Sequence, residues 1–211
     1  LGFDLCDVAI VTNVGEGDHL GLNGIDQIAD LARVKAVPVR AVSARGAAVL
    51  NADDPLVVEM AKLCRGTVVY FSRNESSPVL AAHRAAGGTV VTVLDAQLAI
   101  ARGRHVTPVA RVDQLPLTLG GRVGFQVDNL LASVAAAHWL GLPIEAIRAG
   151  VKSFTSDVAS APGRFNVLTH QGSTIVLDYG HNASALVALN EALAKFSSKR
   201  RKVVYTAAGD R

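Results

Sequence analysis

The chain has 211 residues, of which 50% are hydrophobic and 5% aromatic, and its formal net charge is +3 at pH 7. Such a length can bury one large core and part of another, and the small charge argues against a nucleic-acid-binding protein. The sequence has no apolar run of about 18 residues and no leader-like start, so it predicts neither a membrane span nor export.

In the first third of the chain, short continuous apolar runs alternate with segments whose apolar residues recur at helical spacing. The continuous apolar residues 8–11 predict a strand buried on both faces, and residues 25–34 predict the helix that follows it. Further elements are expected as strands at 37–42, 47–50 and 67–71, and as a helix over 54–63 that begins at an Asp-Pro cap. This alternation is typical of an α/β protein with a mostly parallel sheet.

From Gly87 the pattern changes to short alternating runs separated by Gly or Asp, which end at P-L-T-L over 116–119. These runs predict antiparallel strands, and therefore an extension of the sheet or a flap. Helical spacing returns over 125–140 and 144–154.

Residues 157–163 are small and polar and are broken by Pro162, so we place a domain boundary there, between residues 1–160 and residues 161–211. Beyond the boundary the sequence predicts a Rossmann-like domain that opens with strands at 165–169 and 174–179, a helix at 183–196 and a strand at 202–206. A turn at Gln171-Gly172 would join the first two strands.

The two cysteines, Cys6 and Cys64, are too few for a disulfide framework and lie in apolar segments, so we expect reduced, buried thiols and a cytoplasmic protein. The basic cluster Lys199 to Lys202 has no interleaved aromatic residue that could stack on bases, and it is interpreted as a solvated turn.

The most informative motif is T-N-V-G-E-G-D-H-L from Thr12 to Leu20, followed sixteen residues after His19 by Lys35. An Asp-His pair after an apolar strand places a carboxylate and an imidazole where a Mg²⁺-nucleotide can sit, at the carboxyl end of the strand. Here the sequence resembles the Mur ligase superfamily, which joins amino acids or peptides through acyl-phosphate intermediates. The resemblance implies that His19 binds the metal and takes part in catalysis.

The same resemblance implies that Lys35 is carbamylated, which would convert a cation that repels Mg²⁺ into an oxygen ligand of catalytic importance. Considered alone, His19 fits a loop or capping histidine, and Lys35 fits a lysine on a helix surface. These alternatives stay open at the level of sequence.

The resemblance extends over the whole chain, through L-G-F-D-L-C-D-V at Leu1, V-L-N-A-D-D-P-L-V at Val49, P-L-T-L-G-G at Pro116, A-P-G-R-F-N at Ala161 and L-D-Y-G-H-N at Leu177. The D-H-L-G ending of the first motif and the P-L-T-L-G-G segment are similar to the branch that makes cyanophycin. That branch implies ATP and Mg²⁺ as cofactors, with arginine attached to a poly-aspartate acceptor by a homo-oligomeric enzyme.

A P-loop, G-x-x-x-x-G-K-[ST], holds the ATP phosphates in these ligases and does not occur in these residues. We therefore expect the chain to be an internal fragment that is inactive in isolation.

The resemblance also implies a set of nucleotide contacts. The amide of Asn129 would pair with adenine, the guanidinium of Arg164 would reach the phosphates and act in catalysis, and the carboxylate of Asp178 would accept hydrogen bonds from the ribose. The remaining candidates are His181, Asn182, Asp210 and Arg211.

Simpler structural roles remain for several of these residues. Asn129 fits a helix cap, and Arg164 fits a surface arginine after a Pro-Gly turn. Residues 51–55, N-A-D-D-P, are assigned to turn and cap chemistry. Two other functions also stay open: another Mur-type ligase, acting on a cell-wall precursor or on folate, and a non-catalytic nucleotide-binding or scaffolding module.

Overall fold

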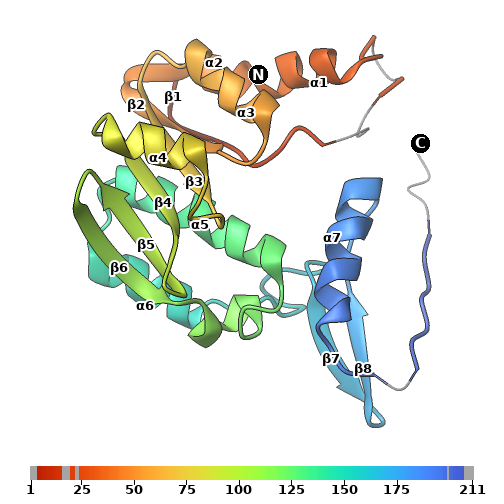
Figure 1. The fold of residues 1–211 in the computed structure, drawn as a ribbon. Helices are drawn as coiled ribbons and strands as arrows, with labels where there is room; N and C mark the ends of the chain where they lie inside the picture. The colour runs from red at the N-terminus through yellow and green to blue at the C-terminus, as the bar shows by residue number, and fades with distance from the viewer. Residues whose placement is uncertain (1–3, 16–19, 22–23, 199, 207–211) are drawn as a thin grey trace.

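The structure is a computed structural model that describes residues 4–15, 20–21, 24–198 and 200–206 (Figure 1). Its elements in chain order are β1 (Cys6–Val11), α1 (Ile28–Lys35), α2 (Val37–Arg40), β2 (Val42–Asn51), α3 (Pro55–Glu59), η1 (Met60–Leu63), β3 (Thr67–Ser72), α4 (Pro78–Ala85), β4 (Thr89–Leu94), β5 (Gln97–Arg102), β6 (His105–Arg111), η2 (Val112–Gln114), η3 (Pro116–Thr118), α5 (Gly124–Trp139), α6 (Ile144–Ser153), β7 (Asn166–His170), β8 (Ser173–Leu177) and α7 (Ala183–Ala194).

Six strands form one sheet in the order β1-β2-β3-β4-β5-β6. The strands β1 to β4 pair in parallel, whereas β5 pairs antiparallel with both β4 and β6. The expected α/β fold with a mostly parallel sheet and an antiparallel extension is therefore confirmed. The parallel part includes β4, although its sequence pattern suggested an antiparallel strand.

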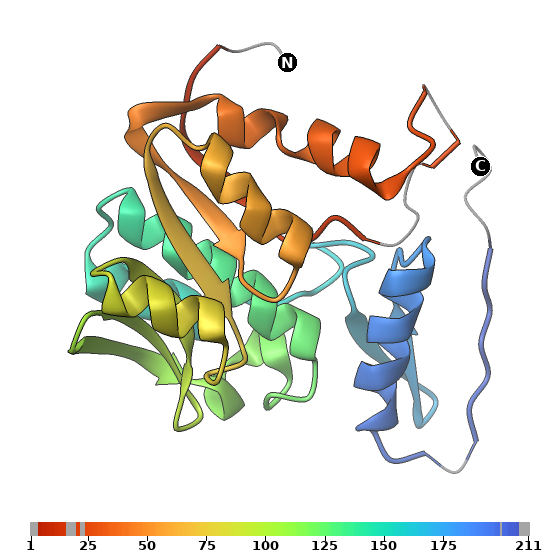
Figure 2. The ribbon, with the colours of Figure 1, turned by 45° about the horizontal axis from the view of Figure 1, so that its top comes forward.

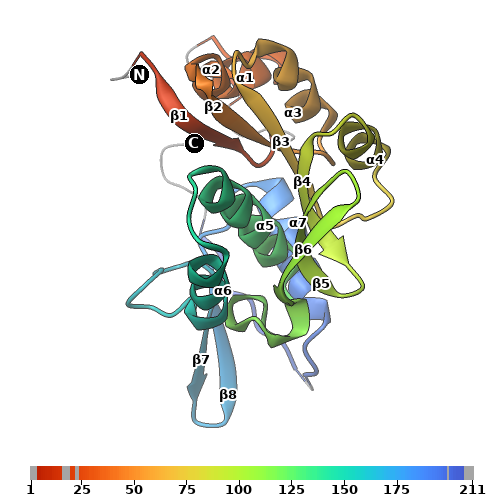
Figure 3. The same cartoon turned by 90° about the vertical axis from the view of Figure 1, so that its left-hand side faces the viewer.

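Side chains of alternate residues along the parallel strands enter two separate cores, one on each face of the sheet. Along β2, Ala47 and Val49 join the core beneath α5 and α6, whereas Ala48 and Leu50 join the core beneath α1, α2, α3 and α4. Figure 3 shows α5 and α6 on one side of the sheet and α1 to α4 on the other. Burial on both faces explains the continuous apolar runs in the sequence.

Among the described residues, helices α3, α4 and α7 begin at side-chain caps. As the sequence predicts, the carboxylate of Asp54 caps α3 by accepting hydrogen bonds from the backbone N–H groups of Leu56 and Val57. Helix α4 was not anticipated, although Ser77 followed by Pro78 is a cap and first-turn signal, and the Ser77 hydroxyl accepts from the N–H of Leu80.

The strands predicted at residues 37–42 and 116–119 are wrong. Residues 37–40 form helix α2, because Pro38 lies in its first turn and Val39 is buried there; β2 begins only at Val42. The P-L-T-L segment forms η3 and ends at Leu119, whose φ is 50°, while the Thr118 hydroxyl donates to the carbonyls of Val112 and Leu115. Local hydrogen bonds there replace pairing with a strand.

A second unit, made of the β7–β8 hairpin and α7, lies beside the sheet (Figure 2). Its turn is at the predicted place, since Gln171 and Gly172 both have positive φ, 47° and 73°. Residues 202–206 form no strand in the structure, so that prediction is wrong. Val203 and Val204 are 83% and 100% exposed, because β7 and β8 pair with each other and the segment does not join them.

An aromatic contact joins the two units. The ring of Phe165 lies 5.7 Å from that of Phe125 and 6.1 Å from that of Phe196, and the Arg122 guanidinium lies 4.3 Å from the Phe196 ring centre. Phe165 is buried, with Val123 and Ala192 in the same small core. This contact fixes how the second unit meets α5.

The two cysteines are free thiols, as expected, but both are half-buried and not buried. Burial raises the pKa of the Cys6 thiol, and Asp7 and Cys64 add to this shift. Among the described residues, none of the helices combines the length and the apolar character that crossing a membrane requires.

Candidate functional site

The loop that leaves β1 at Thr12 is held by side chains from two other elements. The Lys35 ammonium, at the end of α1, donates to the carbonyls of Val14 at 2.8 Å and of Asn13 at 3.3 Å. The Asn51 amide donates to the Thr12 carbonyl at 2.8 Å, and the Asp54 carboxylate accepts from the Val14 N–H at 2.7 Å. The loop, Lys35 and the N-A-D-D turn, which are separate motifs in the sequence, are therefore in direct contact in the structure.

Lys35 is half-buried at the end of α1, and its ammonium is bound to the loop. Two carbonyl oxygens suit an ammonium, and a carbamate in the same position would place negative charge against them. Carbamylation of Lys35 stays a prediction and requires the side chain to leave these carbonyls. His19 lies outside the described residues, and so its predicted metal role stays a prediction as well.

A second polar cluster lies at the carboxyl ends of β2 and β3. The hydroxyl of the fully buried Ser72 donates to the Asp53 carboxylate, at 2.7 and 2.6 Å from its two oxygens. The next residue, Arg73, forms an ion pair with Asp128 of α5 at 2.8 Å. The N-A-D-D turn and α5 are therefore linked through the end of β3.

The Asp128 carboxyl is mostly buried, and burial raises its pKa to about 6, while Asp53 adds to the rise and Arg73 opposes it. The folded state disfavours the charged form of this carboxyl, so the contribution of Asp128 to stability falls as pH rises from about 4 to about 6 and does not change above that. We expect wild type to lose at most about 3 kcal/mol over this interval relative to Asp128→Asn.

Urea unfolding between pH 4 and pH 7, followed by the fluorescence of the single tryptophan, Trp139, measures this difference. If the free energies of unfolding of wild type and Asp128→Asn differ by the same amount at every pH in this range, the pKa of Asp128 is not raised and the prediction is wrong.

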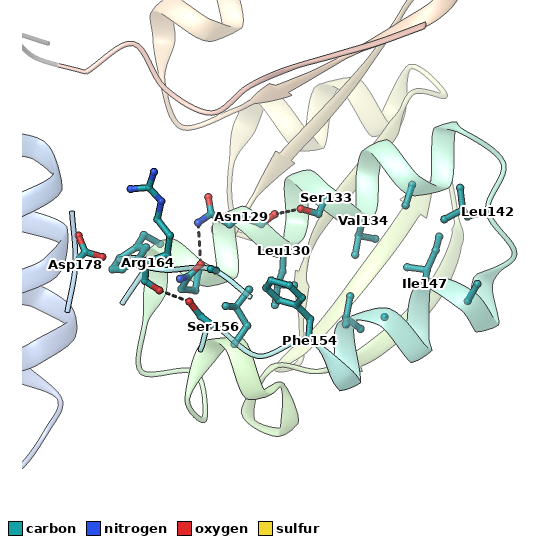
Figure 4. Close-up of a pocket in the computed structure, with 18 residues that line it drawn as sticks. Asn129, Leu130, Ser133, Val134, Leu142, Ile147, Phe154, Ser156, Arg164 and Asp178 are labelled. Carbon is teal, nitrogen blue, oxygen red and sulfur yellow. Dashed lines mark hydrogen bonds between the residues drawn. The ribbon is translucent and has the colours of Figure 1, made fainter. Parts of the chain in front are cut away.

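Two cavities meet beside α5. The first, of about 570 Å³, is a mainly apolar groove between α5 and α6 that ends at Asn129, Arg164 and Asp178 (Figure 4). The second, of about 700 Å³, lies between the β1 loop, the N-A-D-D turn and the start of α7. Asn129 and Asp178 line both cavities, so they lie where the two meet.

Asn129 lies in the second turn of α5, and its amide donates to the Gln126 side chain at 3.0 Å. The residue that precedes α5 is Val123, so the alternative that Asn129 caps this helix is wrong. Gln126 is buried, which fixes the position of the amide next to it. Such an amide can donate and accept in one plane, as pairing with a purine base requires.

Arg164 and Asp178 meet at the junction of the two units. The Arg164 guanidinium lies 5.6 Å from the ring centre of Tyr179. The backbone carbonyl of Arg164 accepts a hydrogen bond from the Ser156 hydroxyl (Figure 4). The Asp178 carboxylate accepts from the N–H of Phe165 at 2.9 Å and of Gly180 at 2.7 Å. Phe165 has a φ of 53°, a backbone conformation that residues other than glycine rarely adopt, and its hydrogen bond to Asp178 helps to hold it there. The carboxylate oxygens of Asp178 keep further lone pairs for a ligand.

Of the other predicted contacts, Asn182 lines the second cavity and caps α7 by accepting from the Ala185 N–H at 2.7 Å. His181 lines neither cavity, and its ring nitrogen lies 3.2 Å from the Tyr179 carbonyl. Asp210 and Arg211 lie outside the described residues. The structure thus brings together Asn129, Arg164 and Asp178, with Asn182 next to them.

In the described part of the chain, no three His, Cys, Asp or Glu side chains are grouped so that they could hold a metal ion. Mg²⁺ prefers oxygen ligands, and the carbonyl oxygens nearest to Lys35 are occupied by its own ammonium.

Sequence reasoning missed three residues at the site. Asp128 is a charged residue within an apolar helix, which is a usable signal, and Arg73 follows directly after a buried strand. Asn166 is fully buried: its amide donates to the carbonyls of Ser156 and Ala161, and its oxygen accepts from the Gly163 N–H. It therefore ties residues 156–163, at the predicted domain boundary, to the start of β7.

Residues 5–137 match the family described as Mur ligase middle domain. The cyanophycin synthetase of Geminocystis herdmanii is 37% identical over 204 residues, which cover 97% of this chain and 23% of that protein. A UDP-N-acetylmuramoyl-L-alanyl-D-glutamate--2,6-diaminopimelate ligase of Bacillus cereus is 30% identical over 167 residues, which cover 78% of this chain and 30% of that protein.

The MurF ligase of Thermotoga maritima, solved in complex with ADP, has a similar fold. The TM-score is 0.59 and the identity 22%, over 92% of this chain and 40% of that one. The chain thus spans less than half the length of each of these relatives.

Proposed function

The chain belongs to the Mur ligase family, and from that premise we propose that it carries the nucleoside-binding part of an ATP-dependent ligase that forms amide bonds. The observation that supports this most directly is the convergence of Asn129, Arg164 and Asp178 at one end of the groove between α5 and α6. They come from a helix, a turn and the end of a strand, and they meet where the two units join.

In this proposal each side chain has one task. The Asn129 amide pairs with adenine, Asp178 accepts from the ribose hydroxyls with its free lone pairs, and the Arg164 guanidinium faces the phosphates. A carboxylate oxygen of the substrate attacks the γ-phosphorus of ATP, and ADP leaves. An amine then attacks the acyl carbon of the resulting acyl phosphate, loses a proton and expels phosphate to give the amide. Mg²⁺, with His19 and carbamylated Lys35 as ligands, stays a prediction from the sequence.

We further propose that the amine donor is arginine and that the carboxylates are aspartate side chains of a poly-aspartate backbone. Identity to a cyanophycin synthetase is 37% over nearly the whole chain, against 30% over a shorter part for a cell-wall diaminopimelate ligase. We also expect the complete enzyme to be a cytoplasmic homo-oligomer.

The test is incorporation of labelled arginine into a poly-aspartate primer by the full-length protein with ATP. Incorporation that depends on both ATP and primer supports the proposal. ATP hydrolysis with another amino acid and acceptor would keep the ligase site but assign it to a different Mur-type enzyme. Binding of ATP without any ligation would favour the non-catalytic module.

A further inference from the structure

We propose that Asn51 and Asp54 are positioning residues of the ligase reaction, because they fix the loop 12–14 against which the Lys35 side chain is held. This inference rests on the function proposed above. It gives the N-A-D-D turn a role in the reaction in addition to its role in starting α3.

Three side chains bind three consecutive residues of this loop. Asn51 donates to the Thr12 carbonyl at 2.8 Å, and Asp54 accepts from the Val14 N–H at 2.7 Å. Lys35 donates to the carbonyls of Asn13 and Val14. The Val14 side chain is itself buried in the core beneath α1 to α4, which fixes the end of the loop. Consequently neither end of the loop can shift without loss of a hydrogen bond.

Asn51 and Asp54 each use one part of the side chain for the turn and the other part for the loop. The Oδ1 atom of Asp54 accepts from the first turn of α3, and its Oδ2 atom accepts from Val14. The Oδ1 atom of Asn51 accepts from the Asp53 N–H, and its Nδ2 atom donates to Thr12. A helix cap needs a single oxygen, as Ser77 shows on α4, so the second bond of Asp54 is not required for α3.

The loop is part of the site, because Asn13, Val14 and Gly15 line the second cavity together with Asn129 and Asp178. The residues assigned to adenosine lie on α5 and at the junction of the two units, not on this loop. Displacement of the loop should therefore disturb the reacting groups near Lys35 more than the binding of ATP. The expected signature is a lower kcat with a nearly unchanged KM for ATP.

Two variants of the full-length protein separate the roles. Asp54→Ser keeps a cap oxygen for α3 but loses the bond to Val14, and Asn51→Asp keeps the acceptor for Asp53 but loses the donor to Thr12. Each should lower kcat about 10- to 100-fold and change the KM for ATP less than about threefold. The matched control is Ser77→Ala, which removes the cap of α4 and should leave kcat unchanged.

A double-mutant cycle and hydrogen exchange make the test specific. If Asp54 acts through the Lys35 site, Asp54→Ser should add little to the effect of Lys35→Ala on kcat. In the same variant the loop 12–14 should exchange its amide hydrogens faster. Faster exchange with wild-type kcat, unchanged exchange, or fully additive effects on kcat would each overturn the proposal. If wild type shows no ligase activity, the proposed function fails, whereas exchange still reports whether Asp54 holds the loop.

Discussion

Lys35→Ala is expected to lower ATP-dependent arginine incorporation by the full-length protein about 100-fold or more, since comparable losses follow removal of a single charged or polar group at a reaction centre. The side chain contacts two carbonyls of the loop that lines the second cavity. The sequence resemblance predicts that it also lies beside the metal. The measurement is the initial rate with labelled arginine. Lys62→Ala is the matched control, because Lys62 is an exposed lysine paired with Glu59 on the surface, and it should retain the wild-type rate.

Lys35→Arg separates the two chemical roles of the side chain. Arginine keeps the positive charge and the donors but cannot carry the carbamate. Loss of activity in Lys35→Arg, with partial recovery of Lys35→Ala by added short carboxylates, would support the carbamate. Full activity of Lys35→Arg would contradict it and leave the ammonium contact with the loop as the function of this residue. Wild-type activity of Lys35→Ala would contradict both roles.

Phe165→Ala is expected to destabilise the chain by about 3 kcal/mol or more. The ring is 3% exposed and contacts Phe125 and Phe196 at the junction of the two units. Removal of the ring would leave a cavity between α5 and α7. The hydrogen bond from the backbone N–H of residue 165 to Asp178 would remain, but the apolar contact between the two units would be lost. Urea unfolding followed by Trp139 fluorescence gives the free energy of unfolding.

Phe154→Ala is the matched control for Phe165→Ala. Phe154 is the same residue type and is also near the junction, but it is 45% exposed and lines the open groove. Its loss should cost less than about 1 kcal/mol. Equal destabilisation by the two variants would show that the Phe165 contact does not hold the units together.

Most of the sheet could be predicted from the sequence, because strands buried on both faces leave continuous apolar runs that local reading detects. The strands β1 and β3 and the helices α5 and α6 lie within a few residues of their predicted positions. The errors fall where a local pattern was ambiguous. Residues 37–40 are apolar enough for a strand, but Pro38 starts a helical turn, and residues 202–206 would need a partner strand that β7 and β8 do not supply.

The candidate site was predictable only as separate motifs. The N-A-D-D turn was correctly assigned to cap chemistry, but its hydrogen bonds to the loop after β1 join residues about 40 positions apart in sequence. The Arg73–Asp128 ion pair spans 55 positions. Motif spacing cannot reveal such contacts, because the distance between strand ends depends on the order of strands in the sheet.

The sequence by itself determined the fold class, the family resemblance and the residue types of the site, because these depend on local apolar patterns and short motifs. Only the tertiary structure decided which of those residues meet. It placed Asn129, Arg164 and Asp178 around one cavity, gave the Lys35 ammonium two backbone carbonyls, half-buried Asp128 and fully buried Asn166. The physical reason is that strand order and helix packing bring distant segments together, and burial then sets the hydrogen-bond partners and the charge of each group.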